Sequence, residues 1–162
     1  MIAPGCQTVG IEIANNYMIN RDNIRKDFST RNLLPPKALL QGNSMDPEMR
    51  RQAREAIGSQ AVFDAIVADP PYGIRESTGF NEKSPLEELF SAISTDRESG
   101  HRLLEKGGRL VAFVPVTDEE TLTDMLPDSD STEDAGMVFE VCREQPLNEK
   151  LSRWLVSFVC VR

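Results

Sequence analysis

Residues 61–72 read Ala-Val-Phe-Asp-Ala-Ile-Val-Ala-Asp-Pro-Pro-Tyr, and this stretch decides the fold. Its first eight residues are apolar apart from Asp64, which predicts a central strand buried on both faces. Pro70 and Pro71 should end this strand, because proline cannot donate to a strand ladder. A carboxylate, two rigid residues and an aromatic ring are therefore expected at the carboxyl end of a strand, where open α/β sheets bind ligands.

The residues from Asp69 to Tyr72 suit chemistry on a planar amine. Such an amine is a poor nucleophile because its lone pair is delocalised into the ring, and an oxygen that accepts its N–H bonds favours the attacking form. Asp69 would supply a carboxylate, and the prolines would hold the carbonyl of Pro70 outward. Tyr72 could stack on a base that has left its own stack. The alternative is an Asp-Pro turn beside a half-buried tyrosine.

Alternating strands and helices surround this stretch. Strands are expected at residues 8–13, 38–41, 61–68 and 109–115, helices at 15–32, 47–57, 84–106 and 118–126, and two antiparallel strands at 137–143 and 153–161. Alternation of this kind predicts one α/β domain over residues 1–162 with a mostly parallel sheet and right-handed crossovers.

Smaller signals mark the ends of these elements. Ser44 could cap the helix at 47–57, and Ser84 with Glu87 has the spacing of a capping box. Gly107-Gly108 should end the helix that begins at Ser84, which has a second candidate break at Ser99-Gly100. The acidic stretch 128–134 is typical of a solvated loop, and Gln145–Asn148 should form the turn between the last two strands.

Composition excludes several kinds of site. His101 is the only histidine, which disfavours histidine triads and metal clusters, so no metal site is expected. Cys6, Cys142 and Cys160 are odd in number and lack metal-ligand spacing, as for ordinary thiols in a reducing compartment. The chain shows neither a secretory signal nor an apolar run of membrane length, so a cytoplasmic location is predicted.

The segment Asp69-Pro-Pro-Tyr-Gly-Ile-Arg-Glu-Ser-Thr78 resembles the catalytic segment of the tRNA guanine-10 N2-methyltransferases, which often carry an RNA-binding THUMP domain. The closing stretch from Glu144 to Leu155 is similar to the end of that family, including its Gln-Pro-x-Asn and Ser-Arg elements. The resemblance implies a Rossmann-like class I methyltransferase fold with a C-terminal antiparallel strand pair. It also implies S-adenosyl-L-methionine as cofactor, methyl transfer to the exocyclic N2 amine of a guanine, tRNA as substrate and a small zinc-containing activator subunit as partner.

The same resemblance assigns site residues. Those implied for catalysis are Asp69, Pro70, Pro71 and Tyr72. Those implied for cofactor binding are Glu12, Asn43 and Asp69, with Glu12 on the ribose hydroxyls and Asn43 accepting from the adenine amine. The alternative for Glu12 is an exposed acid at a strand end.

One part of the expected cofactor site is not found in the sequence. The family's glycine-rich segment should precede Gly10 by about two dozen residues, but only nine residues precede it here. The expectation is a catalytic domain truncated at its N-terminus, without the first strand and the Gly-rich loop, that binds S-adenosylmethionine weakly or not at all. The strand at 8–13 would then pair with the strand at 61–68, or another chain would fill the gap.

The net charge of −8 conflicts with RNA binding, because phosphate contacts normally come from a basic surface. Basic residues cluster at Arg50–Arg54 and near Arg153, so the grip on a large RNA should come mainly from elsewhere. Two other functions stay open. One is another amino-methyltransferase that acts on adenine N6 or a protein glutamine, and the other is a non-catalytic remnant or interaction domain.

Overall fold

The computed structural model describes residues 5–13, 21–58, 62–69 and 85–162. The chain forms two compact units, Met1–Ala61 and Val62–Arg162, which are described separately. The expected capping box of Ser84 and the residues from Pro70 to Tyr72 lie outside the described residues. Among the described residues, no helix is both long enough and apolar enough to span a membrane.

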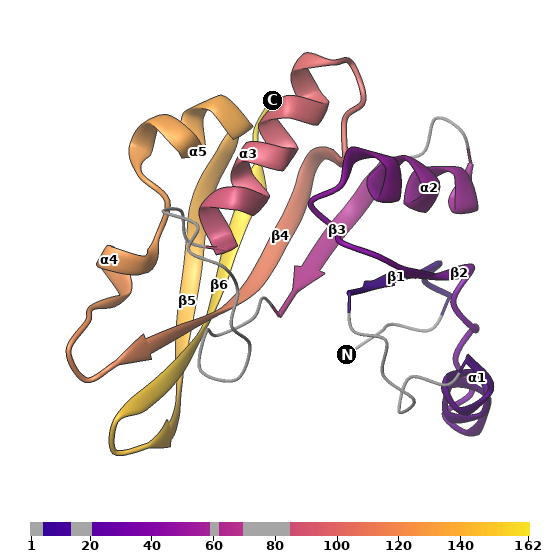
Figure 1. Cartoon of the computed structure of the whole chain (residues 1–162), viewed down its shortest axis with the longest axis horizontal. Helices are drawn as coiled ribbons and strands as arrows, with labels where there is room; N and C mark the ends of the chain where they lie inside the picture. The colour runs from indigo at the N-terminus through magenta and orange to yellow at the C-terminus, as the bar shows by residue number, and fades with distance from the viewer. Residues whose placement is uncertain (1–4, 14–20, 59–61, 70–84) are drawn as a thin grey trace. The chain divides into compact units, whose positions relative to one another are not determined.

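The first unit contains a parallel pair of strands and two helices (Figure 1). Strand β1 (Val9–Glu12) pairs in parallel with β2 (Ala38–Gln41), so that Glu12 is opposite Gln41. Helix α1 (Arg21–Thr30) lies between them in the chain, and α2 (Pro47–Ile57) follows β2. These elements confirm the predicted strands at 8–13 and 38–41, the helix at 47–57 and the later part of the helix at 15–32.

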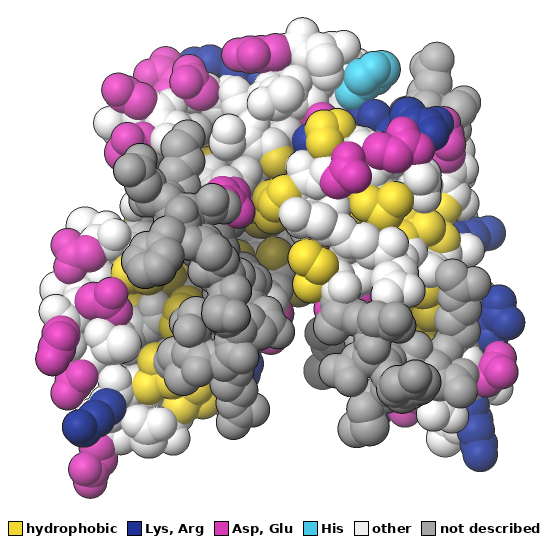
Figure 2. Space-filling view, viewed as in Figure 1, with side chains coloured by type: hydrophobic (Ala, Val, Ile, Leu, Met, Phe, Trp, Pro, Cys, Tyr) yellow, Lys and Arg dark blue, Asp and Glu magenta, His cyan; other side chains and the backbone are white. Residues whose placement is uncertain are grey.

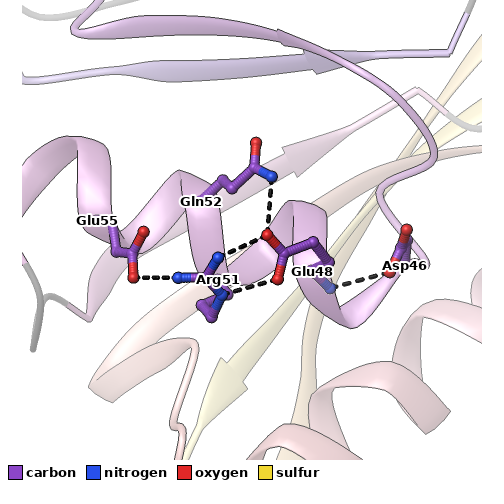
Figure 3. Close-up of polar contacts among 5 residues, drawn as sticks. All are labelled: Asp46, Glu48, Arg51, Gln52 and Glu55. Carbon is purple, nitrogen blue, oxygen red and sulfur yellow. Dashed lines mark hydrogen bonds and ion pairs between the residues drawn. The ribbon is translucent and has the colours of Figure 1, made fainter.

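Helix α2 is capped by Asp46 and not by Ser44, so that detail of the prediction was wrong. The Asp46 side chain accepts a hydrogen bond from the backbone N–H of Glu48 at 2.9 Å. Arg51 forms ion pairs with both Glu48 and Glu55 on the exposed surface of the same helix (Figure 3). Asp46 is better placed than Ser44 because it directly precedes Pro47, a favourable first helical residue.

The second unit contains a four-stranded sheet. In spatial order the strands are β3 (Phe63–Ala68), β4 (Leu104–Thr117), β6 (Leu151–Cys160) and β5 (Met137–Asn148). β3 and β4 are parallel, whereas β4 with β6 and β6 with β5 are antiparallel, which confirms the predicted closing pair. Within the first unit β1 pairs with β2, and within the second β3 pairs with β4.

The position of β3 corrects one prediction. We expected a central strand buried on both faces, but β3 is at the edge of the four-stranded sheet. Asp64 and Ala65 are exposed, and Val67 retains 76% of its accessible surface. A run of apolar residues indicates that a strand can be buried. It does not indicate how many neighbouring strands pair with it.

Helix α3 (Pro85–Glu98) is shorter than the predicted helix at 84–106. It ends at the expected break, where Gly100 has a φ of 77° that favours glycine. His101 falls within the predicted helix at 84–106, but it follows α3 and is exposed. The extension to Lys106 was also wrong, because β4 already begins at Leu104.

Gly107 and Gly108 therefore lie inside β4 and do not end a helix. A Cβ atom added to Gly108 would lie 2.9 Å from the carbonyl oxygen of Asp64 and 2.8 Å from that of Glu105. The β3–β4 register shifts between Phe63 and Ala65, next to this close approach. Glycine is needed here for lack of space between two strands.

Two short helices, α4 (Leu122–Met125) and α5 (Ser129–Ala135), follow β4. α4 confirms the helix expected within 118–126, whereas the solvated loop predicted at 128–134 is helical. Asp128 caps α5 by accepting from the Ser131 N–H at 2.7 Å, and Gly136 ends it with a φ of 67°. Acidic side chains gather over α4 and α5 (Figure 2), so the solvation was predicted correctly and the conformation was not.

The core of the second unit lies between α3 and the sheet (Figure 1). Phe90 of α3 is fully buried and meets the ring of Phe158 on β6 edge to face, with 4.8 Å between ring centroids. The largest fully buried side chains are Phe90, Leu104, Leu110, Val156 and Phe158. This packing fixes β4 and β6, the two strands beside which the candidate site lies.

Candidate functional site

Asp69 directly follows β3, at the carboxyl end of the strand, as predicted from the sequence. Its side chain is 58% exposed. Ala68 is opposite Ala112 in the parallel register, so Asp69 and Phe113 follow at the same level of the sheet. A carboxylate is thus presented at the edge where open α/β sheets bind their ligands.

Arg153 of β6 extends toward this carboxylate. Its Nη1 atom lies 4.0 Å from Oδ2 of Asp69, and the guanidinium lies over the ring of Phe113 at 4.1 Å from the centroid. Nε and Nη2 of Arg153 both donate to Oε1 of Gln145, at 3.2 and 2.8 Å. Strand register explains this convergence, because Arg153 is opposite Pro115 on β4 and Gln145 on β5.

The Gln-Pro-x-Asn and Ser-Arg elements therefore lie opposite each other on the paired strands β5 and β6. Gln145–Asn148 does not form the predicted turn but belongs to β5, and the chain reverses at Glu149-Lys150. Oδ1 of Asn148 accepts from the Lys150 N–H at 2.9 Å and so stabilises that reversal. Ser152 donates to Glu144 at 2.6 Å on the neighbouring rungs.

Gln145 and Arg153 were not predicted as site residues. The only sequence signal was that the Gln-Pro-x-Asn and Ser-Arg elements resemble the same family as the Asp69 segment. Their convergence with Asp69 depends on three different strands, and no spacing in the sequence reports it.

Glu12 and Asn43 both lie at the carboxyl ends of the parallel strands β1 and β2 in the first unit. Glu12 is the half-buried last residue of β1, and its carbonyl oxygen accepts from the Gly42 N–H at 2.9 Å. Asn43 is exposed in the loop after β2, where its Oδ1 accepts from the Met45 N–H at 2.9 Å. A carboxylate suits a pair of ribose hydroxyls and an amide suits a purine edge, so both residue types fit an adenosine group.

Arg50 fixes the loop that carries Asn43. Arg50 belongs to α2 and its side chain is buried. Its Nη1 atom donates to the carbonyl oxygens of Ser44 at 3.1 Å and Met45 at 2.6 Å. The predicted basic cluster at Arg50–Arg54 is thus not an open basic surface. Arg50 and Arg54 are buried, and the exposed Arg51 is held between two carboxylates.

Hydrogen bonds to arginine shift the pKa of two surface carboxyls. The Arg51 guanidinium, with help from Gln52, lowers the pKa of Glu48 to about 2. Hydrogen bonds from Arg109 and then Ser157 lower the pKa of Glu140. Both groups favour the ionised form, as expected for carboxylates that accept bonds from cations.

A hollow of about 370 Å³ opens near the end of β4, and its lining includes Glu120, Glu144, Lys150 and Trp154 but neither Asp69 nor Arg153. In the described part of the chain, no three His, Cys, Asp or Glu side chains are grouped so that they could hold a metal ion.

Comparison with known proteins places these features in context. The chain is similar to tRNA (guanine(10)-N(2))-methyltransferase TRMT11 of Xenopus laevis, with 36% identity over 83 residues that cover 41% of this chain. The matched region spans 17% of the length of that relative. The resemblance to this family predicted from the sequence is confirmed over that region. No protein-family model matches the chain.

Solved structures support the fold. A methyltransferase from Pyrococcus furiosus matches 97% of this chain and 64% of its own, with a TM-score of 0.53 and 14% identity. SMU.776, which is assigned to the methyltransferases and was solved with SAH, matches 93% of this chain and 39% of its own, with a TM-score of 0.56 and 16% identity. The predicted Rossmann-like methyltransferase fold class is therefore confirmed.

Proposed function

We propose that this protein transfers a methyl group from S-adenosylmethionine to the exocyclic N2 amine of a guanine in tRNA. The observation that carries the proposal is the similarity to a tRNA guanine-10 N2-methyltransferase, together with the carboxylate of Asp69 at the end of β3. The methyltransferase fold supports the reaction class, and the guanine target rests on the similarity alone.

Asp69 would accept an N–H of the guanine amine and favour its attacking form. The carbonyl of Pro70 would accept or orient the second N–H, and Tyr72 would stack on the extruded base. S-adenosylmethionine, when bound, supplies a methyl group on a sulfonium, which is already a strong leaving group. Positioning by the protein would therefore supply most of the acceleration.

Glu12 and Asn43 would contact the cofactor. Glu12 would accept hydrogen bonds from the ribose hydroxyls. Oδ1 of Asn43 accepts from the Met45 N–H with one lone pair and would accept from the adenine amine with the other. These roles, the single catalytic domain over residues 1–162, the cytoplasmic location and the zinc-containing activator remain predictions.

The test combines methyl transfer with product analysis. The full chain is incubated with unmodified tRNA and labelled S-adenosylmethionine, and the tRNA is then digested to nucleosides. An active form of this protein should give N2-methylguanosine, and the matched Asp69→Ala variant of that form should give none. Label in N6-methyladenosine or in a protein glutamine would replace the guanine assignment.

Calorimetry with S-adenosylmethionine distinguishes an enzyme from a non-catalytic interaction domain. A folded chain that neither binds the cofactor nor transfers its methyl group would overturn the enzymatic proposal for this chain. That outcome would favour a non-catalytic interaction domain.

A further inference from the structure

We infer that Arg153 is a positioning residue that acts through the Asp69 carboxylate. This inference rests on the proposed function for the role of Asp69 as the acceptor of the amine N–H. It adds Arg153, and its support Gln145, to a site otherwise assigned from the Asp-Pro-Pro-Tyr segment alone.

The guanidinium of Arg153 is fixed from two sides. Gln145 accepts from two of its nitrogens, and the ring of Phe113 lies against its face. The Arg153 side chain is only 26% exposed, although it carries a charge on the surface of a sheet. A guanidinium that is already ordered loses little conformational entropy when it orients a neighbouring carboxylate.

Arg153 interacts with Asp69 electrostatically and not through a direct hydrogen bond at this contact. The 4.0 Å between Nη1 and Oδ2 is an ion-pair distance and exceeds the length of a direct N–H···O hydrogen bond. A fixed positive charge at that distance draws the carboxylate toward one orientation, in which its oxygens can accept an amine N–H.

Strand pairing does not need this contact. β4 and β6 are joined by backbone pairing from Arg109 opposite Val159 to Thr117 opposite Leu151. The core packing of this region uses the opposite face of β6, through Val156 and Phe158. The side chain of Arg153 therefore connects two otherwise unrelated motif elements with Asp69.

The first experiment observes the guanidinium of Arg153 in the full chain by ¹⁵N NMR. Asp69→Asn should shift the Nε and Nη signals of Arg153, and Gln145→Leu should shift them and increase rotation about the guanidinium. Arg143→Gln is the matched control, because Arg143 is exposed on β5 two residues before Gln145. Arg153 signals that stay the same in Asp69→Asn, with an unchanged backbone amide spectrum, would overturn the inference.

The second experiment separates kcat from KM. Arg153→Gln and Arg153→Lys should each lower kcat roughly tenfold while KM for S-adenosylmethionine stays within about twofold, because Lys lacks the planar fork that Gln145 holds. In the Asp69→Asn background, Arg153→Gln should lower kcat by less than about a further twofold. Wild-type kcat in Arg153→Gln, or full additivity of the two changes, would contradict a positioning role. If the wild-type chain transfers no methyl group, the proposed function fails, whereas the NMR result still decides whether Arg153 orders Asp69.

Discussion

Arg109 on β4 and Glu140 on β5 form a two-bond ion pair that spans the intervening strand β6. Nε of Arg109 donates to Oε2 of Glu140 at 2.9 Å, and Nη2 donates to Oε1 at 2.7 Å. The buried Ser157 of β6 donates to the same carboxylate at 3.0 Å. One glutamate thus links three strands of the sheet, on the far side of β4 from β3.

We expect the contribution of Glu140 to stability to depend on pH. Its pKa in the folded chain is lowered from 4.5, so the contribution is present above that value and is lost as the pH falls through the folded pKa. Urea unfolding should show wild type more stable than Glu140→Gln at neutral pH, with a smaller difference in acid. Glu149→Gln, in the exposed turn, is the control, and an equal difference at both pH values would contradict the prediction.

Asp69→Ala should abolish methyl transfer while the fold is retained. The substitution removes an orienting acceptor from an exposed position but no contact in the core, and such losses typically cost on the order of 100-fold or more. Transfer rates and far-UV circular dichroism measure the two effects. Activity within a few-fold of wild type would reject Asp69 as the acceptor.

Tyr72→Phe should be mild and Tyr72→Ala severe. Stacking on the target base needs the ring and not the hydroxyl, and it contributes about 1–3 kcal/mol per base. kcat/KM with tRNA measures both variants. A phenylalanine variant as inactive as the alanine variant would mean that the hydroxyl takes part in the chemistry.

Arg50→Met should loosen the loop after β2. It leaves the carbonyl oxygens of Ser44 and Met45 without the Arg50 donor, and because both residues are only half-buried the loss of stability should be below the roughly 1–3 kcal/mol typical of buried groups. Amide exchange of Met45 and Asp46 should accelerate, since both N–H groups bond to Asn43 in this loop. Arg25→Met on the exposed surface of α1 is the control, and equal exchange in the two variants would show that Arg50 does not hold the loop.

Local signals in the sequence predicted several elements well. Pro47 and Gly58 bracket α2, and the proline pair before Lys37 separates the α1 region from β2. The sequence of α5 carries the same signals, with an aspartate before it and Gly136 after it. The prediction of a loop at 128–134 followed the acidic composition instead of these capping residues. Asp128 shows that a charged segment can be helical when its caps are in place.

The remaining differences depend on distant parts of the chain. The edge position of β3 follows from which strands pair, and Arg153 meets Gln145 and Asp69 only because β6 lies between β4 and β5. Likewise, the burial of Arg50 and Arg54 depends on which way α2 faces, which the charges alone do not report.

Gly108 limits how this protein can vary. Any side chain at this position would meet backbone oxygens of β3, which cannot rotate away as a flexible side chain would. Relief would require β3 to move away from β4 and the backbone at Glu105 to shift as well, and Asp69 follows directly from β3. Among natural relatives that keep this strand pairing, position 108 should therefore tolerate almost no replacement, and a library of variants selected for activity should retain glycine there.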